Sequence, residues 1–242
     1  MRAARSASSS SPASNIACAA TDRRAREQGI LTPCLLRKGG GFGARPVNPL
    51  PPFAPGLRVG LFGGSFNPAH AGHRLVCEIA LRRLALDRIW LLVTPGNPLK
   101  KNNNLAPFAE RMARARAAIP DPRVIVSDLE AKIGVRYTFD TIDYVTRRAP
   151  GVRFCWIMGA DNLGQFDRWQ NWRGIAARLP MAIVDRPHAD KAAFSKAAQA
   201  LARWRTPEED APGLLLRRPP AWVFLHDRQL DLSSTAIRGS LR

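Results

Sequence analysis

The chain has 242 residues, of which 45% are hydrophobic, and it carries a formal net charge of +18 at pH 7. This length can hold one large domain or two small ones, and no uninterrupted apolar run reaches membrane-spanning length, so we expect a soluble protein. The charge is compatible with nucleic acid or with a small polyanionic partner. Much of the positive charge comes from arginines on expected helix faces, and such arginines usually lie on a solvated surface. They include Arg82, Arg83, Arg111, Arg114 and Arg116.

Residues 1–56 differ in composition from the rest of the chain. They are rich in Ser, Ala, Pro, Gly and Arg and show no sustained period of either strand or helix, so they are poor material for a core. We expect a disordered basic extension here, followed by a single domain over residues 57–242. The extension resembles a transit peptide, but a mis-assigned upstream start codon would produce the same kind of segment. The mass of the native N-terminus distinguishes the two.

From residue 57 onward, short apolar runs alternate with helical patterns. This alternation is typical of a parallel sheet with helices on both faces. We therefore expect a Rossmann-like, doubly wound α/β fold, in which ligands bind outside the carboxyl ends of the strands. The expected strands are 57–62, 88–94, 124–126, 152–158, 181–184 and 221–225, and the expected helices are about 72–86, 108–118, 139–148, 191–204 and 235–241.

The turn after the first expected strand carries the strongest chemical signal. The apolar run 57–62 ends at Gly63-Gly64, and His70 and His73 follow where a helical pattern begins. A helix N-terminus presents unpaired N–H groups and a partial positive charge, so it is a natural site for phosphate. The two histidines add donors that a glycine turn alone does not supply. The segment therefore predicts a phosphate-binding site.

Two other interpretations of the histidine pair stay open at this point. A histidine near a helix start is often only a capping or packing residue. A zinc site is compatible with the spacing of the pair, but the other ligands are missing. Cys77 lies on an apolar helical face, and neither a Cys-x-x-Cys pair nor a His-Glu-x-x-His motif occurs in the chain. We therefore expect no protein-held metal ion.

Two motifs resemble those of one enzyme family. GGSFNPAHAGH, residues 63–73, is similar to the H-x-G-H signature of the nucleotidyltransferase superfamily, within the pattern GG-[ST]-F-[DN]-P-x-H-x-G-H of nicotinate-nucleotide adenylyltransferases. SSTAIR, residues 233–238, resembles the S-S-T-x-I-R motif that closes over the ATP phosphates in that family. The motifs occur in the family's order and about a domain apart, and the resemblance covers residues 57–242.

The resemblance implies transfer of the adenylyl group of ATP to nicotinate mononucleotide, with release of pyrophosphate and formation of deamido-NAD. The mononucleotide phosphate is already an anion, so we expect direct in-line displacement without a protein nucleophile. Mg²⁺ is implied by the triphosphate and not by a ligand cluster. Carried over by position, the catalytic residues are His70, His73 and Arg238, and the ATP-binding residues are Gly63, Gly64, Ser65, Phe66, Gly159, Asp161, Ser234, Thr235 and Ile237.

The acceptor site depends more heavily on the resemblance. YTFDT, residues 137–141, resembles the Y-T-x-D-T element whose backbone binds the pyridine carboxylate, and Trp169 takes the place of a tryptophan that stacks on the pyridine ring. From the residues alone, a partly buried core position is the more common explanation for such a tryptophan. Arg186-Pro187 matches a family R-P loop, but a helix-entry turn explains the proline equally well. The implied substrate-binding residues are Lys100, Tyr137, Thr138 and Trp169.

Two positions depart from the family pattern. Asn67 replaces the more usual Asp of the first motif, an exchange between two turn-forming residues. Leu99 stands where many relatives have His before the basic residue, so only Lys100 is carried over. Many relatives continue with another helical segment after the last motif, and the oligomeric state is therefore left open.

Other functions remain possible from the sequence. A sibling adenylyltransferase would act on nicotinamide mononucleotide, FMN or phosphopantetheine, although the first histidine of H-x-G-H and the Y-T-x-D-T element argue against phosphopantetheine. A basic nucleic-acid-binding module is the remote alternative, but the chain has no known reader motif. We expect neither a nucleic-acid nor a membrane partner. Four cysteines without a pairing pattern suit a reducing cytoplasm.

Overall fold

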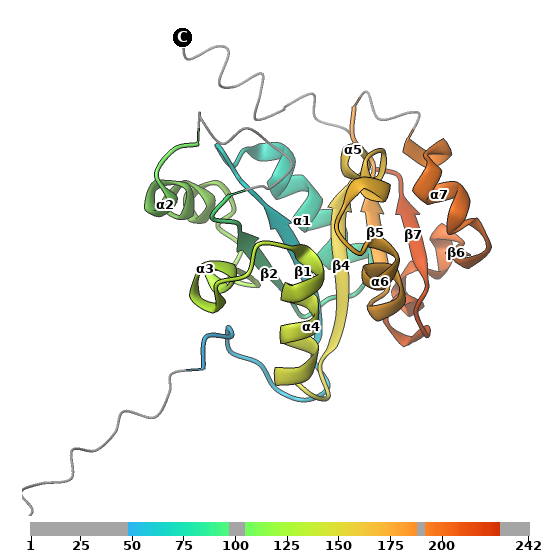
Figure 1. The fold of residues 1–242 in the computed structure, drawn as a ribbon, viewed down its shortest axis with the longest axis horizontal. Coiled ribbons are helices and arrows are strands. Elements are labelled where there is room, and N and C mark those ends of the chain that lie inside the picture. Colours follow the sequence, from blue (N-terminus) through green and yellow to red (C-terminus); the bar gives the residue numbers. More distant parts are fainter. Residues whose placement is uncertain (1–47, 97–104, 188–191, 228–242) are drawn as a thin grey trace, which may run out of the picture. The chain divides into compact units, whose positions relative to one another are not determined.

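The computed structural model describes residues 48–96, 105–187 and 192–227, which Figure 1 draws in colour. They form a seven-stranded sheet in the order β3-β2-β1-β4-β5-β7-β6, in which all hydrogen-bonded neighbours run parallel. This confirms the expected Rossmann-like class. Among these strands, only β6 was not expected from the sequence, because a strand of two residues is too short to show alternating hydrophobicity. The strands are β1 Arg58–Gly64, β2 Arg88–Val93, β3 Val124–Ser127, β4 Arg153–Gly159, β5 Met181–Val184, β6 Arg205–Thr206 and β7 Trp222–Leu225.

Helices cover both faces of this sheet. Successive side chains of a strand point to opposite faces, so Trp90 and Leu92 join one buried cluster while Leu91 and Val93 join the other. Helices α4, α6 and α7 contribute to the first cluster, and α1 and α2 to the second (Figure 1). The helices are α1 Ala71–Arg83, α2 Phe108–Ala118, α3 Leu129–Ile133, α4 Thr138–Arg148, α5 Ala160–Leu163, α6 Trp172–Arg178 and α7 Lys196–Ala200, with 3₁₀ turns at Phe166–Arg168, Ala192–Phe194, Ala202–Trp204 and Glu208–Leu216.

The long helix expected over 191–204 is wrong. Ser195 interrupts it because its side-chain oxygen accepts from the backbone N–H of Ala198 at 3.3 Å and begins α7 as an N-cap. A serine that bonds nearby backbone groups competes with helix continuation. The short helices α3, α5 and α6 were not expected, since each has too few residues for a helical period. The helix expected over 235–241 lies outside the described residues.

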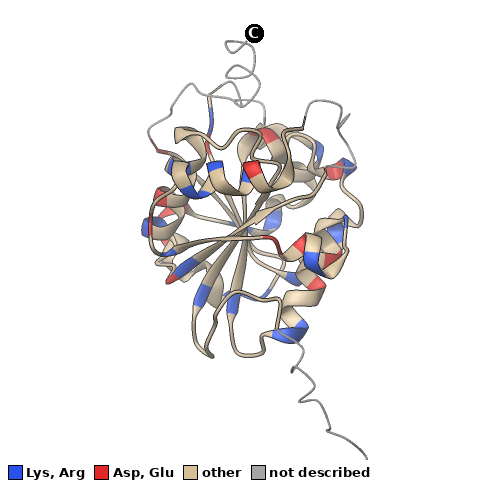
Figure 2. Ribbon diagram, turned by 90° about the vertical axis from the view of Figure 1, so that its left-hand side faces the viewer, with Lys and Arg blue, Asp and Glu red and all other residues tan. Residues whose placement is uncertain are grey.

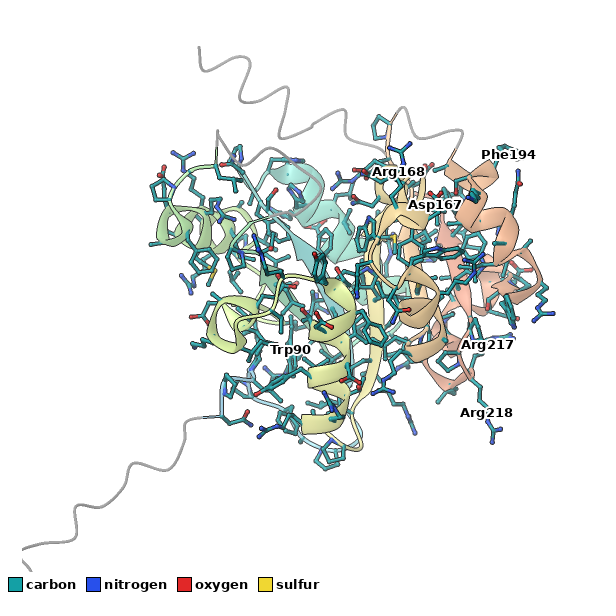
Figure 3. The ribbon with its side chains drawn as sticks, viewed as in Figure 1. Trp90, Asp167, Arg168, Phe194, Arg217 and Arg218 are labelled. Atoms are coloured by element: carbon teal, nitrogen blue, oxygen red, sulfur yellow. The ribbon has the colours of Figure 1, made fainter. Side chains whose placement is uncertain are left out.

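Residues 48–56 pack against the core through two apolar side chains, whereas the sequence predicted a disordered extension over 1–56. Leu50 is buried, and the ring of Phe53 packs edge-on against Trp90 with a centroid separation of 6.4 Å; Trp90 is labelled in Figure 3. The backbone N–H of Gly56 also donates to the carbonyl of Gly151 at 2.8 Å. The described residues all fall within one compact unit, Val47–Arg242. The composition of the sequence placed the start of the folded domain too late. Two apolar side chains among prolines do not produce the periodic pattern of a strand or a helix.

Basic and acidic residues are interspersed over the described helices and loops (Figure 2). Several arginines that the sequence placed on solvated faces pair with neighbouring carboxylates, as Arg83 does with Glu208 at 2.8 Å and Arg114 with Glu110 one helical turn away. Such exposed pairs contribute little to stability. Arg111 is the exception, because only 1% of it is exposed. The expected solvated position is therefore wrong for this arginine.

The sheet positions the site through the adjacent strands β1 and β4. The strands β1 to β3 are added toward one edge of the sheet, and the strands from β4 onward are added toward the other edge. The carboxyl ends of the strands at such a switch point form the usual ligand crevice of open α/β sheets. Gly63 and Gly64 end β1, and Gly159 ends β4. A Cβ at Gly63 would lie 2.7 Å from Cη2 of the buried Trp156. The absence of a side chain at Gly63 therefore leaves room for the indole of Trp156 to pack over the end of β1.

We expect Gly63→Ala to lower the free energy of unfolding by about 1–3 kcal/mol, because the indole of Trp156 is packed and cannot move aside freely. Gly213→Ala is the matched control, since no atom lies within 4 Å of a Cβ built there. Chemical denaturation of both variants measures the difference. Equal midpoints for Gly63→Ala and the unmodified chain would contradict the steric argument.

Candidate active site

The helix that follows β1 begins with two histidines that cap each other. His70 is the N-cap of α1, and its Nδ1 accepts from the backbone N–H of Gly72 at 3.1 Å. In return, Nδ1 of His73 accepts from the backbone N–H of His70 at 3.3 Å. Two otherwise unpaired backbone donors of the helix start are thereby satisfied. The capping interpretation of these histidines is confirmed, and it leaves a ring nitrogen of each histidine for other contacts.

The capping bonds also decide which ring nitrogen carries the proton. A neutral imidazole has one donor and one acceptor nitrogen, so an accepting Nδ1 leaves the proton on Nε2 in both rings. The ring centroids are 3.9 Å apart. Nε2 of His70 is buried and has no hydrogen-bond partner among the described residues. A buried donor without a partner is costly, and it points to a ligand with an acceptor oxygen at this position.

Both histidines are held in the neutral form. Burial, followed by the positive charge of Arg186, lowers the pKa of His70 to about 4. Burial, the neighbouring ring of His70 and Arg186 hold the pKa of His73 well below its usual value. Near pH 7 the pair therefore offers two N–H donors without bringing two positive charges together.

Phe66 packs against the histidine pair. Its side chain is buried, and its ring lies edge-on to His73 with a centroid separation of 5.0 Å. A Cβ at Gly64 would lie 3.1 Å from Cζ of this ring, so glycine makes room for it. Phe66 has a φ of 45°, which is uncommon for a residue with a side chain and is held here by the packing. Phe66 therefore supports the position of His73, and its expected contact with ATP stays a prediction.

A second part of the site forms where β4 and β5 end. Asp161 lies in the first turn of α5 with its side chain half exposed, and Arg186 follows β5. Nη1 of Arg186 is 3.7 Å from Oδ1 of Asp161, and Nε of Arg186 lies 2.8 Å from where a Cβ of Gly159 would be. Gly159 thus lets the guanidinium cross the end of β4. The sequence left Arg186 undecided between a family loop and a turn, and the fold brings its charge close to the histidines.

The expected acceptor residues lie on α4 and before α6. Tyr137 is the N-cap of α4 and is exposed, and Thr138 begins the helix. Trp169 is half-buried, with its ring edge-on to Trp156 and Phe166 at centroid separations of 6.3 Å and 5.4 Å. Figure 3 shows the two residues before it, Asp167 and Arg168, beside α5. Trp169 therefore has a packed edge, as the core interpretation predicts, and part of its surface remains open.

Glu130, which the sequence did not mark as a site residue, is a buried carboxyl beside this region. Its Oε1 accepts from the hydroxyl of Thr141 at 3.0 Å, inside the Y-T-x-D-T element. Burial raises the pKa of Glu130, while hydrogen bonds from Thr141 and Thr94 oppose that rise. Glu130 also lines a cavity of about 410 Å³ together with Gly96 and Arg136. Nothing in the local sequence distinguishes this glutamate from a surface residue.

Some expected site residues lie outside the described parts of the chain. Their roles stay predictions; they are Lys100, Ser234, Thr235, Ile237 and Arg238. Within residues 48–96, 105–187 and 192–227, no group of three or more His, Cys, Asp or Glu side chains is arranged to hold a metal ion. In the same ranges no helix is long and apolar enough to span a membrane.

We expect the ring of His70 to titrate near pH 4, and Arg186→Met to raise the pKa of both histidines because it removes a nearby cation. In the unfolded chain His70 takes up its proton near the ordinary pKa of 6.5. The free energy of unfolding therefore falls as the pH drops from about 6.5 toward 4, and this contribution is complete above that range. NMR titration of the imidazole signals measures the pKa values.

Arg147→Met is the control, since Arg147 pairs with Asp143 on the exposed part of α4. It should leave the histidine pKa values unchanged. A pKa near 6.5 for His70, or the same value with and without Arg186, would contradict the electrostatic argument.

Comparison with known proteins agrees with this geometry. Residues 61–240 match the Cytidylyltransferase-like family. The chain is 58% identical over 183 residues to the probable nicotinate-nucleotide adenylyltransferase of Bradyrhizobium sp. (strain BTAi1 / ATCC BAA-1182), covering 75% of this chain and 95% of the relative. It is 52% identical over 183 residues to the corresponding protein of Brucella abortus (strain 2308), covering 75% of this chain and 94% of the relative.

A solved structure shares the fold at lower sequence identity. It is Plasmodium falciparum nicotinic acid mononucleotide adenylyltransferase complexed with NaAD, with a TM-score of 0.58 and 18% identity over 76% of this chain and 83% of that one. At this identity the likeness supports the fold alone. The sequence relatives are matched over nearly their whole length, with more than half of the aligned residues identical. The chain therefore belongs to the nicotinate-nucleotide adenylyltransferase family.

Proposed function

We propose that this protein transfers the adenylyl group of ATP to nicotinate mononucleotide, releasing pyrophosphate and forming deamido-NAD. The observation that carries the proposal is the buried Nε2 of His70 at the N-terminus of α1, beside His73, for which the described residues supply no hydrogen-bond partner. A helix N-terminus with two additional N–H donors suits a phosphate that gains charge during a reaction. The membership of the chain in this family and the names of its relatives agree with this reaction.

The reaction is a direct displacement at the α-phosphorus of ATP. An oxygen of the mononucleotide phosphate forms the new bond to phosphorus, and the bond from phosphorus to the oxygen of the departing pyrophosphate breaks. The attacking phosphate oxygen is an anion at neutral pH, so no side chain has to remove a proton. Catalysis then consists of positioning the two substrates and stabilising charge on the phosphoryl oxygens. Neutral His70 and His73 do this through Nε2–H, without a proton transfer.

We assign the remaining contacts to ATP by position. Gly63, Gly64 and Ser65 present the turn beside the phosphates, and Asp161 accepts from the ribose hydroxyls. Arg238 and Ser234 contact the β- and γ-phosphates, with the backbone of 235–237 beside them. Mg²⁺ would reach the site with the substrate as MgATP, because the triphosphate itself binds the ion.

The start of α4 suits the pyridine carboxylate of the acceptor. The side chain of Tyr137 makes no capping bond to the first turn of this helix, so N–H groups near Thr138 are available to an anion. A carboxylate accepts from such donors with both oxygens, whereas an amide turns an N–H₂ donor toward them on one side. We therefore assign the acid form of the mononucleotide as substrate, with Trp169 against the ring and Lys100 near the phosphate.

The two described cysteines are consistent with a cytoplasmic location, which we also propose. Cys77 and Cys155 are free and buried, and burial raises the pKa of both thiols. Thiols of this kind are inert packing residues. Free thiols are the usual state of cysteine in a reducing compartment.

Incubation with ATP, Mg²⁺ and one acceptor at a time tests the proposed substrates. We expect the mass of deamido-NAD and one equivalent of pyrophosphate with nicotinate mononucleotide, and a kcat/KM at least about tenfold lower with nicotinamide mononucleotide, because the loss of one charge-assisted hydrogen bond is worth about that factor. FMN and phosphopantetheine complete the panel. Equal kcat/KM for the acid and amide forms would reject the acceptor assignment, and product only with FMN or phosphopantetheine would reject the proposed reaction.

His70→Asn separates the catalytic role of His70 from its capping role. Asparagine is a good N-cap, so we expect α1 and the melting temperature to be retained. Loss of the Nε2–H donor should lower kcat by about 10²–10³-fold. His226→Asn is the matched control, because His226 is exposed and bonded to Glu208. Unchanged turnover in both His70→Asn and His73→Asn would remove the central claim.

A further inference from the structure

Arg111 is a fully buried arginine that the proposed reaction leaves without a role. It belongs to α2, and only 1% of it is exposed. In the described part of the chain it forms no ion pair with a carboxylate. A guanidinium remains charged in proteins, and burial of a charge is costly unless hydrogen bonds compensate it. The contacts of Arg111 therefore show how its buried charge is compensated and which segments it joins.

Within the described residues, the hydrogen bonds of Arg111 go to backbone carbonyl oxygens at the ends of β1 and β2 and just before α2. Nη1 donates to the carbonyl of Ser65 at 2.7 Å and to that of Thr94 at 2.8 Å. Nη2 donates to the carbonyl of Pro95 at 3.1 Å, and Nε to that of Ala106 at 3.0 Å. One planar group thus joins the turn after β1, the exit of β2 and the segment before α2.

Two further bonds tie the same three segments together. The side-chain oxygen of Asn67 accepts from the backbone N–H of Ala106 at 3.1 Å. The backbone N–H of Thr94 donates to the carbonyl of Gly64 at 3.0 Å. Asn67 is therefore more than a turn-forming replacement for Asp, because it connects the histidine-bearing loop to the start of α2. Arg111 lies where these connections meet.

We infer that Arg111 is a positioning residue for ATP, which holds the turn after β1 in its phosphate-binding conformation by binding the Ser65 carbonyl together with the β2 exit. The inference rests on the proposed function, since it assigns the phosphates to this turn. The bond to Ser65 turns that carbonyl oxygen inward, away from a phosphate that it would repel. No carboxylate neutralises the guanidinium among the described residues, so its charge adds to the positive potential that the phosphates meet.

The test compares Arg111→Met, Arg111→Lys and a control on the same helix, Arg114→Met. Arg114 is about half exposed and pairs with Glu110. For each variant, steady-state kinetics give the KM values for ATP and for nicotinate mononucleotide. Titration calorimetry gives the Kd of α,β-methylene ATP, and amide exchange reports the protection of residues 65–67 and 94–96. Thermal unfolding shows that each variant is folded under the assay conditions.

We expect Arg111→Met to raise the KM for ATP and the Kd of the analogue at least about tenfold, which corresponds to one lost charge-assisted hydrogen bond. The KM for the mononucleotide should change less than twofold, and exchange at residues 65–67 should accelerate. Arg111→Lys keeps the charge without the planar fork and should recover part of the affinity. Arg114→Met should match the unmodified protein in every measurement.

A folded Arg111→Met variant with unchanged analogue affinity would overturn the inference. Equal increases in both KM values, together with a lower melting temperature, would also overturn it, because they indicate a general packing role. If Arg111→Met does not fold, Arg111→Lys decides by the same two criteria. If the unmodified protein forms no dinucleotide, the proposed function fails, while the analogue affinities of the unmodified protein and the variants still decide the role of Arg111.

Discussion

The reciprocal capping of His70 and His73 is the interaction on which the rest of the site depends. It begins α1 at the carboxyl end of β1 and uses the Nδ1 atom of each ring. Because those atoms accept, the protons lie on Nε2, and both donors remain for a ligand. Burial keeps the rings neutral. One local arrangement therefore decides the helix start, the tautomer and the character of the phosphate site.

Glycines at the ends of the strands make room for large side chains that pack over those ends. Gly63 lies against the indole of Trp156, Gly64 lies over the ring of Phe66, and Gly159 gives way to the guanidinium of Arg186. Each missing Cβ makes room for a group that supports the site or contributes charge to it. The glycine motif in the sequence is thus explained by what it packs against as well as by its turn.

Two arginines contribute positive charge to the site, and they differ in their exposure to solvent. Arg186 is partly open to solvent beside Asp161 and acts on the pKa values of the histidines. Arg111 is buried behind the turn, and its partners among the described residues are backbone carbonyls. If the histidines were protonated, their charges would add to those of the two arginines before a substrate arrived. Neutral histidines avoid that repulsion and still supply directed donors.

The sequence by itself determined the α/β class, the strands other than β6, the glycine turn with its two histidines and the family. These features depend on local periods and on short motifs, which neighbouring residues encode. Only the tertiary structure decided that Arg111 is buried, that Arg186 lies near His70, that Glu130 bonds to Thr141 and that residues 48–56 join the core. Those contacts join segments that are separate in the sequence. A helix face whose residues predict exposure to solvent can be covered by loops from other parts of the chain. The helix expected over 191–204 failed for a more local reason. The Ser195 side chain accepts from the backbone N–H of Ala198 and starts a separate short helix, despite a favourable helical composition.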